Sequence, residues 1–144
     1  MTLKPVITGQ EVVFAALSGD LVGMARTIVQ AMDKTSVSRL IFITSMGIYN
    51  EIPASVGQEG NLKNNPILQK YRDADDIIED SDLAYTLIRP GWFDNGSLEY
   101  KVTYKDEPFG GHNIAIASIA DLVKRLIENE EVGIRDSLGI HRSE

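Results

Sequence analysis

The chain contains no cysteine, which excludes disulfide bonds, thiol nucleophiles and cysteine-ligated metals. Its two histidines, His112 and His141, are isolated and have no ligand partners at metal-binding spacing, so we predict no metal site. No stretch approaches the roughly 20 apolar residues that cross a bilayer. The N-terminal MTLKPVITGQ has neither a long apolar core nor a small-residue cleavage pattern. We therefore expect a cytoplasmic protein without a membrane partner.

Positive charge is also scarce, with 14 Lys and Arg against 21 Asp and Glu and a formal net charge of −7. Because nucleic-acid binding depends on basic side chains that contact phosphates, we expect no nucleic-acid partner. We interpret the acid excess as a means of solubility. One helix carries several of these acids without calcium-loop spacing, and we expect them to form a solvated face: Asp73, Asp75, Asp76, Glu79 and Asp80.

The sequence does contain three continuous apolar runs, at residues 12–17, 39–45 and 84–89. They lack the alternation of a half-solvated strand, so each is typical of a strand buried on both faces inside a parallel sheet. Apolar residues at helical spacing follow the first two runs and predict two helices, from Leu21 to about Lys34 and from Asn65-Pro66 to Ser81-Asp82. The alternation of strands and helices predicts an α/β fold with helices on both faces of a parallel sheet.

The remainder of the chain is less regular. Short strands are predicted over residues 98–104 and 113–117, and a final edge strand over 137–140. Ser118 and Asp121 have the spacing of a capping box at the start of another helix. The 144 residues match the length of a single domain, and no repeat or linker divides them.

Small or hydroxyl residues stand where each long apolar run stops, in Ala16-Leu17-Ser18-Gly19, Thr44-Ser45-Met46-Gly47 and Arg89-Pro90-Gly91-Trp92. Ligands of open parallel sheets bind outside the carboxyl ends of the strands. Any one of these ends is explained by an ordinary turn, but the three together favour a binding site.

Several segments resemble the atypical short-chain dehydrogenase/reductases, in particular their NmrA-like, NAD(P)H-binding branch with its NADH-flavin reductases and biliverdin reductase B. The segments are RLIFITSMGIY (39–49), Tyr71 in the following helix, and YTLIRPG (85–91). The resemblance covers most of the chain, from about Gln10 to about Ile127. It implies that residues 12–17 are the fourth strand of a dinucleotide-binding sheet with strand order 3-2-1-4-5-6.

The glycine-rich turn of that family is missing, because no G-x-G-x-x-G occurs in the sequence. That turn and its helix normally hold the cofactor's pyrophosphate. The resemblance therefore implies that residues 1–144 form a single incomplete NAD(P)-binding Rossmann-like domain, a partial doubly wound sheet from strand four onward. We expect weak binding of a dinucleotide by this chain alone.

The resemblance also implies site residues. The cofactor would lie against residues after the three strands: Ala16, Leu17, Ser18, Thr44, Ser45, Pro90, Gly91, Trp92 and Phe93. Ser45 would orient a substrate oxygen or touch the nicotinamide. Tyr71 stands where many reductases have the tyrosine of a Tyr-x-x-x-Lys pair, but Asp75 replaces the lysine. Since a carboxylate disfavours the phenolate, we interpret Tyr71 as a packing or cofactor-touching residue more than as a general acid. Tyr49 is interpreted as surface packing.

The implied activity is hydride transfer from NADP or NAD, in reduced form, to a flavin- or quinone-like small-molecule acceptor. Two alternatives remain open. The chain could be a non-catalytic NmrA-type module for nucleotide sensing or protein interaction, or a fragment without activity of its own. The absence of the first three strands also leaves an open edge at residues 12–17. We expect a second copy in a homo-oligomer, the N-terminal ten residues or a further segment to cover it.

Overall fold

The computed structural model describes residues 12–129 and 131–143, and its strands form two sheets. The larger sheet has five strands, in the order β1 (Val12–Ala15), β2 (Arg39–Ile43), β3 (Ala84–Pro90), β7 (Asp136–His141) and β5 (Lys101–Thr103). The first four run parallel, and β5 is antiparallel to β7. The smaller sheet pairs β4 (Trp92–Asp94) in parallel with β6 (Asn113–Ala115). This mostly parallel sheet confirms the predicted α/β class.

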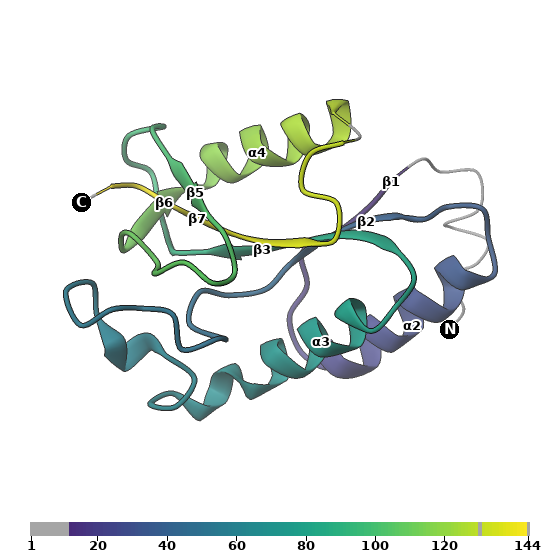
Figure 1. Ribbon diagram of the computed structural model, residues 1–144, viewed down its shortest axis with the longest axis horizontal. Coiled ribbons are helices and arrows are strands. Elements are labelled where there is room, and N and C mark those ends of the chain that lie inside the picture. The colour runs from purple at the N-terminus through teal and green to yellow at the C-terminus, as the bar shows by residue number, and fades with distance from the viewer. Residues whose placement is uncertain (1–11, 130, 144) are drawn as a thin grey trace.

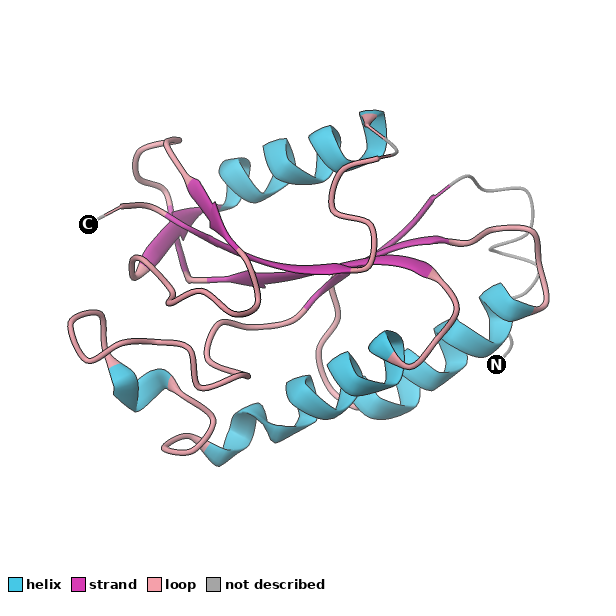
Figure 2. Ribbon diagram, viewed as in Figure 1, coloured by secondary structure: helices cyan, strands magenta, loops and turns pink. Residues whose placement is uncertain are grey.

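Helices cover both faces of the larger sheet, as Figures 1 and 2 show. Helices α2 (Leu21–Asp33) and α3 (Gln69–Glu79) lie side by side on one face, and α4 (Ile116–Glu128) lies on the other. Two 3₁₀ turns, Gln58–Gly60 and Pro66–Leu68, interrupt the long segment between β2 and α3. Within the described residues, no helix has the length and apolar character that a membrane span requires.

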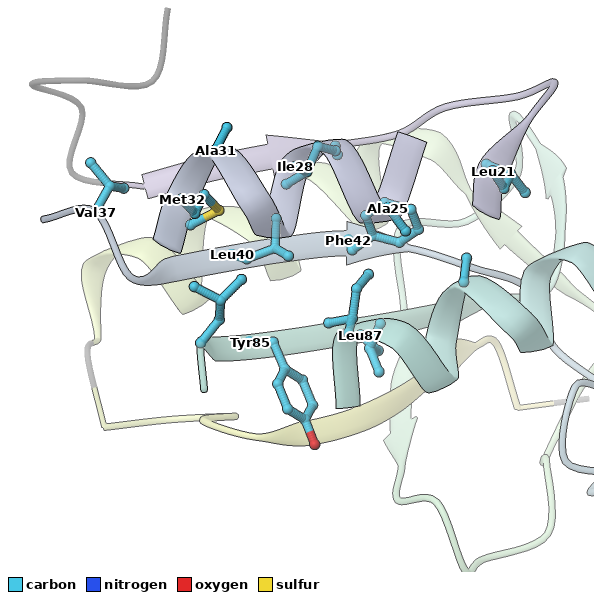
Figure 3. Close-up of a cluster of buried hydrophobic side chains, with 14 residues drawn as sticks. Leu21, Ala25, Ile28, Ala31, Met32, Val37, Leu40, Phe42, Tyr85 and Leu87 are labelled. Carbon is cyan, nitrogen blue, oxygen red and sulfur yellow. The ribbon is translucent and has the colours of Figure 1, made fainter. Parts of the chain in front are cut away.

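The continuous apolar run of β2 is explained by a core on each side of it. Leu40 and Phe42 point toward α2 and α3, where they meet a cluster of buried side chains from both helices and β3 (Figure 3). Ile41 points the opposite way, into a second cluster with residues of α4 and β7. Successive strand residues face opposite sides, so only a strand covered on both faces needs an apolar residue at every position.

The start of α2 follows the sequence prediction. The carboxylate of Asp20 accepts a hydrogen bond of 3.1 Å from the backbone N–H of Gly23, which satisfies one free donor of the first turn. The next helix differs in detail, because Asn65-Pro66 opens a 3₁₀ turn in which the Asn65 side chain makes no cap bond. Helix α3 itself begins at Gln69.

Two predictions for the C-terminal part need correction, and one strand was missed. β7 is an inner strand between β3 and β5 and not a sheet edge. Ser118 does not cap α4, which begins at Ile116; its hydroxyl instead donates to the carbonyl oxygen of Leu98 at 2.9 Å. The strand β4 was not predicted, because its three residues acquire a strand conformation only by pairing with β6, which follows much later in the chain.

The strand β1 departs from the prediction of a strand buried on both faces. Among the described residues it pairs only with β2 and forms an edge of the sheet. Only Ala15 of its four residues is buried, and Phe14 is 48% exposed. The N-terminal ten residues, which were one expected cover for this edge, lie outside the described residues.

Candidate functional site

A cavity of about 350 Å³ opens where β2 and β3 end, and we call it the site cavity. It brings together most of the site residues expected from the sequence: Thr44, Ser45, Tyr71, Pro90, Gly91, Trp92 and Phe93. The 3₁₀ turn before α3 and the first turn of α3 complete its lining with Asn65, Ile67, Leu68 and Lys70. The cavity therefore lies at the edge of the sheet where parallel α/β proteins bind ligands.

Backbone hydrogen bonds hold the two strand ends together beyond the sheet. The N–H of Thr44 donates to the carbonyl oxygen of Ile88 at 2.7 Å, and the N–H of Met46 donates to that of Pro90 at 3.2 Å. The Thr44 hydroxyl also donates to Ile88, at 3.2 Å, and the hydroxyl of Ser45 donates to the Met46 carbonyl oxygen at 2.9 Å. Both hydroxyls thus lie at the cavity wall in a defined orientation.

Gly91 is required by the close approach of a second chain segment. A Cβ atom at this position would lie 2.4 Å from the carbonyl oxygen of His112, which also accepts a hydrogen bond of 2.8 Å from the N–H of Trp92. This contact joins β4 to the segment before β6 and leaves Trp92 65% exposed beside the cavity. The protein's single tryptophan is therefore a wall of the site.

The residues after β1 lie apart from the site cavity. Ala16 lines a second cavity of about 380 Å³, almost wholly apolar, between β1, the end of β2 and α4. Phe93 lines both cavities, whereas Leu17 and Ser18 are exposed and line neither. The structure therefore collects the expected residues of the second and third strand ends but not those of the first.

Tyr71 and Asp75, the positions compared with a tyrosine–lysine pair, have different surroundings. Tyr71 is half-buried, lines the site cavity and packs against the core between α2 and α3. The ammonium group of Lys70 lies 5.6 Å from the centre of its ring. Asp75, one helical turn later, is fully buried, and its Oδ1 accepts a hydrogen bond of 2.7 Å from the hydroxyl of Tyr49.

Two sequence interpretations are therefore wrong. Asp75 is not part of a solvated acidic face, and Tyr49 is not simply a surface residue. Both belong to a buried cluster that we call the Tyr49 network, made of Tyr49, Glu51, Asp75, Arg89 and Ser137.

Arg89 is the cation of this network and is 0% exposed. Its Nη1 forms an ion pair with Glu51 at 2.5 Å, and its Nε and Nη2 donate to the hydroxyl and carbonyl oxygens of Ser137 at 2.9 and 3.1 Å. A basic residue inside an apolar strand was the available sequence signal, since a buried charge needs a partner. The sequence did not indicate which acids would approach it.

Burial raises the pKa of the Asp75 carboxyl group to about 7, even though the hydrogen bond from Tyr49 favours the ionised form. Burial and the negative charge of Asp75 raise the pKa of Tyr49 in turn, so its phenol keeps its proton. The network therefore contains a phenol that donates a hydrogen bond and a carboxyl group that titrates near neutral pH.

A mostly parallel sheet covered by helices, with a cavity beyond the strand ends, defines a Rossmann-like α/β protein. Residues 1–130 match the family described as NAD(P)H-binding, and the chain belongs to that family. This membership agrees with the resemblance found in the sequence. No curated protein matches the chain.

Solved structures share the fold. A Rossmann-fold NAD(P)-binding family protein from Shigella flexneri is 33% identical, with a TM-score of 0.79 over 97% of this chain and 64% of that chain. A short-chain dehydrogenase/reductase from Veillonella parvula, solved in complex with NADP, is 24% identical with a TM-score of 0.86, over 97% and 66%. ChuY, an anaerobillin reductase from Escherichia coli O157:H7, is 18% identical with a TM-score of 0.71, over 90% and 62%. The chain thus spans about two thirds of the length of these relatives.

Proposed function

We propose that the site cavity binds the nicotinamide half of NADPH or NADH, and that the protein is an NAD(P)H-dependent oxidoreductase of the flavin-reductase type. The observation that carries this proposal is the convergence of Thr44, Ser45, Tyr71 and the 90–93 segment on one cavity. Membership of the NAD(P)H-binding family and the NADP complex of the Veillonella parvula relative support it.

The residues present fit a nicotinamide ring better than a whole dinucleotide. The cavity of about 350 Å³ is at the small end of ligand sites, and its walls combine aromatic faces with two hydroxyls and a glycine backbone. The described residues contain no glycine-rich turn between a strand and a helix at this edge. They therefore provide contacts to the nicotinamide half and none of the usual kind to the diphosphate.

A bound reduced nicotinamide would supply the hydride for the reaction. The protein's own residues would orient and shield the reactants. Trp92 and Phe93 offer aromatic faces, and Ser45, whose hydroxyl donates to the Met46 carbonyl oxygen, offers its oxygen as an acceptor to a ligand N–H such as that of a carboxamide. Lys70 places a positive charge at the other wall of the cavity, which favours an anionic acceptor such as a flavin phosphate. The name of the relative ChuY, an anaerobillin reductase, agrees with a reductase activity.

A second candidate function is nucleotide binding without turnover, as in an NmrA-type sensing module. The observation in its favour is that Asp75 replaces the lysine of the reductase pair and is held by Tyr49 instead. No cation at that position then assists ionisation of Tyr71. Hydride transfer to a flavin does not need such a pair, and we prefer the reductase.

The experiment is a calorimetric titration with NADPH, NADH and reduced nicotinamide mononucleotide, combined with a flavin-reduction assay read at the nicotinamide absorbance. We expect the mononucleotide to bind within a few-fold of the dinucleotides, because the cavity contacts only the shared half. Ser45→Ala should weaken binding, whereas Ser55→Ala, at an exposed position of the following loop, should leave it unchanged. Binding with turnover supports the reductase, binding without turnover supports the sensing module, and no saturable binding contradicts both.

A further inference from the structure

Three members of the Tyr49 network stand close in the chain to residues that line the site cavity. Tyr49 follows Ser45 by four residues in the loop after β2, and Asp75 follows Tyr71 by one turn of α3. Arg89 immediately precedes Pro90 and Gly91 at the end of β3. Each of these three walls therefore carries a network member close to its cavity-lining residues.

In the network, each group donates a hydrogen bond to the next one, from Arg89 through Ser137 and Tyr49 to Asp75. The Nε–H of Arg89 donates to Ser137 Oγ at 2.9 Å, and that oxygen lies 3.0 Å from the hydroxyl oxygen of Tyr49. Tyr49 has one hydroxyl proton, which it donates to Asp75 at 2.7 Å, so the Ser137 hydroxyl must donate to Tyr49. The chain therefore connects a buried guanidinium to a buried carboxylate through two hydroxyl groups.

Asp75 depends on Tyr49 more than on the cations around it. On its own helix, Arg72 is paired with Asp76 at 3.0 Å, and Lys105 from the loop after β5 is paired with Glu79 at 2.8 Å. The buried Arg89 is paired with Glu51, and Tyr85 of β3 is the remaining titratable neighbour. The second carboxylate oxygen of Asp75, Oδ2, is buried without a hydrogen-bond partner among the described residues. Among the described residues, the hydrogen bond from Tyr49 to Asp75 is the one that links α3 to the rest of the network.

We propose that Tyr49 and Asp75 are positioning residues of the site, whose hydrogen bond fixes α3 and the loop after β2 around the cavity. The expected effect of the Tyr49–Asp75 bond on ligand affinity rests on the proposed function. Its expected effect on the shape of the cavity does not depend on any ligand. Because the bond joins a phenol to an ionised carboxylate, the strength with which it holds the walls depends on the charge of Asp75.

The test uses Trp92, the single tryptophan and a wall of the cavity, as a reporter. Its fluorescence is measured without ligand from pH 5 to pH 9 in the wild type, Tyr49→Phe and Asp75→Asn, with Tyr104→Phe as the control for loss of an exposed phenol. We expect a step near pH 7 in the wild type that is absent in D75N. In Y49F the step should move to higher pH, because the lost hydrogen bond stabilised the carboxylate. Far-UV circular dichroism verifies that each variant is folded, and Ser137→Ala replaces Y49F if that variant is not.

Ligand binding is the second readout. Y49F should weaken calorimetric binding of NADPH by up to about tenfold, because the lost bond acts on the ligand only through the order of the cavity walls. Three results would overturn the positioning role. They are no fluorescence step near pH 7 in the wild type, a step that persists in D75N, and a step at the wild-type pH in a folded Y49F. If the step moves as expected but NADPH does not bind the wild type, the proposed function fails and the positioning role stands.

Discussion

A single buried arginine determines much of the environment behind the site. Arg89 lies in an inner strand with no exposed surface, and its five N–H donors can be satisfied only by polar groups brought in from other elements. Glu51 supplies the charge and Ser137 supplies two acceptors. A buried cation left without its counter-ion carries a large desolvation cost, so this pair is needed for stability whatever the site binds.

Glu51→Gln should therefore lower the free energy of unfolding by about 3 kcal/mol, since it leaves the Arg89 charge uncompensated. Urea unfolding followed by circular dichroism measures the effect. The matched control is Glu59→Gln, an exposed glutamate of the same loop, for which we expect a change within about 0.5 kcal/mol. Equal stability of the two variants would contradict a structural role for the ion pair.

The raised pKa of Asp75 predicts a specific pH dependence of stability. In the unfolded chain its ordinary pKa is 3.8, whereas burial raises the pKa to about 7 in the folded protein. As the pH rises from about 4 to 7, the unfolded state loses this proton first, so the contribution of Asp75 to stability falls over that window and is lost above it.

Asp75→Asn removes this dependence. Its stability relative to the wild type should increase between pH 5 and pH 7 by at most roughly 1.4 kcal/mol per pH unit, and then level off. Urea unfolding at several pH values measures the difference, with Asp80→Asn as a control for the loss of one carboxylate from the same helical segment. A difference between D75N and the wild type that does not change with pH would show that Asp75 is ionised in the folded protein throughout.

These residues also mark the limit of what the sequence could predict at this scale. Thr44, Ser45 and the 90–93 segment could be placed at one site because strand ends of a parallel sheet meet at one edge. The sequence could not distinguish the buried Asp75 from the other acidic residues of the helix. Its burial depends on how α3 is rotated against β3 and on the path of the loop that carries Tyr49. Those are tertiary contacts without a local pattern.

At the scale of elements, the long central strands and the short strands β5 and β6 were predicted from the sequence, whereas the short strand β4 was missed. β2 and β3 need apolar residues on both faces, which leaves an unmistakable run in the sequence. β4 and β6 are three residues each and exist because the chain before β6 passes beside Gly91. The wall of the site cavity that Trp92 and Phe93 form therefore depends on a close backbone contact and not on the strand propensity of its residues.

Gly91→Ala tests this contact. The added methyl group would lie 2.4 Å from the carbonyl oxygen of His112, so β4 or β6 must move, at a cost of about 1–3 kcal/mol. Thermal unfolding should show the loss of stability, and Trp92 fluorescence should change. Gly96→Ala, where a Cβ would lie 3.1 Å from the Arg142 guanidinium and would have no backbone atom among its nearest neighbours, should cost less stability than G91A. An unchanged Trp92 spectrum in G91A would contradict the role of this contact in shaping the site.

At the scale of the whole molecule, one side of the edge strand β1 has no strand partner among the described residues. Phe14 is 48% exposed there, and the apolar cavity of about 380 Å³ lies beside it, lined by Ile116, Ile119 and Val123 of α4. The solved relatives are longer than this chain, which covers 64% to 66% of the first of them. An edge strand with apolar surface beside it is a template for pairing with another chain.

We expect the isolated chain to self-associate through this edge, with β1 of one copy against β1 of another. Phe14→Glu places a charge on the edge strand, where it opposes such pairing, and should shift the chain toward the monomer in sedimentation velocity experiments. Val132→Glu, a matched change at an exposed position in the turn that leads to β7, should leave the association unchanged. Hydrogen exchange distinguishes the alternatives, because a wild-type monomer with protected amides at residues 12–15 would mean that another part of the same chain covers the edge. A wild-type monomer with rapidly exchanging amides there would contradict any cover, since an edge strand that neither pairs nor is shielded keeps its outward N–H groups in contact with water.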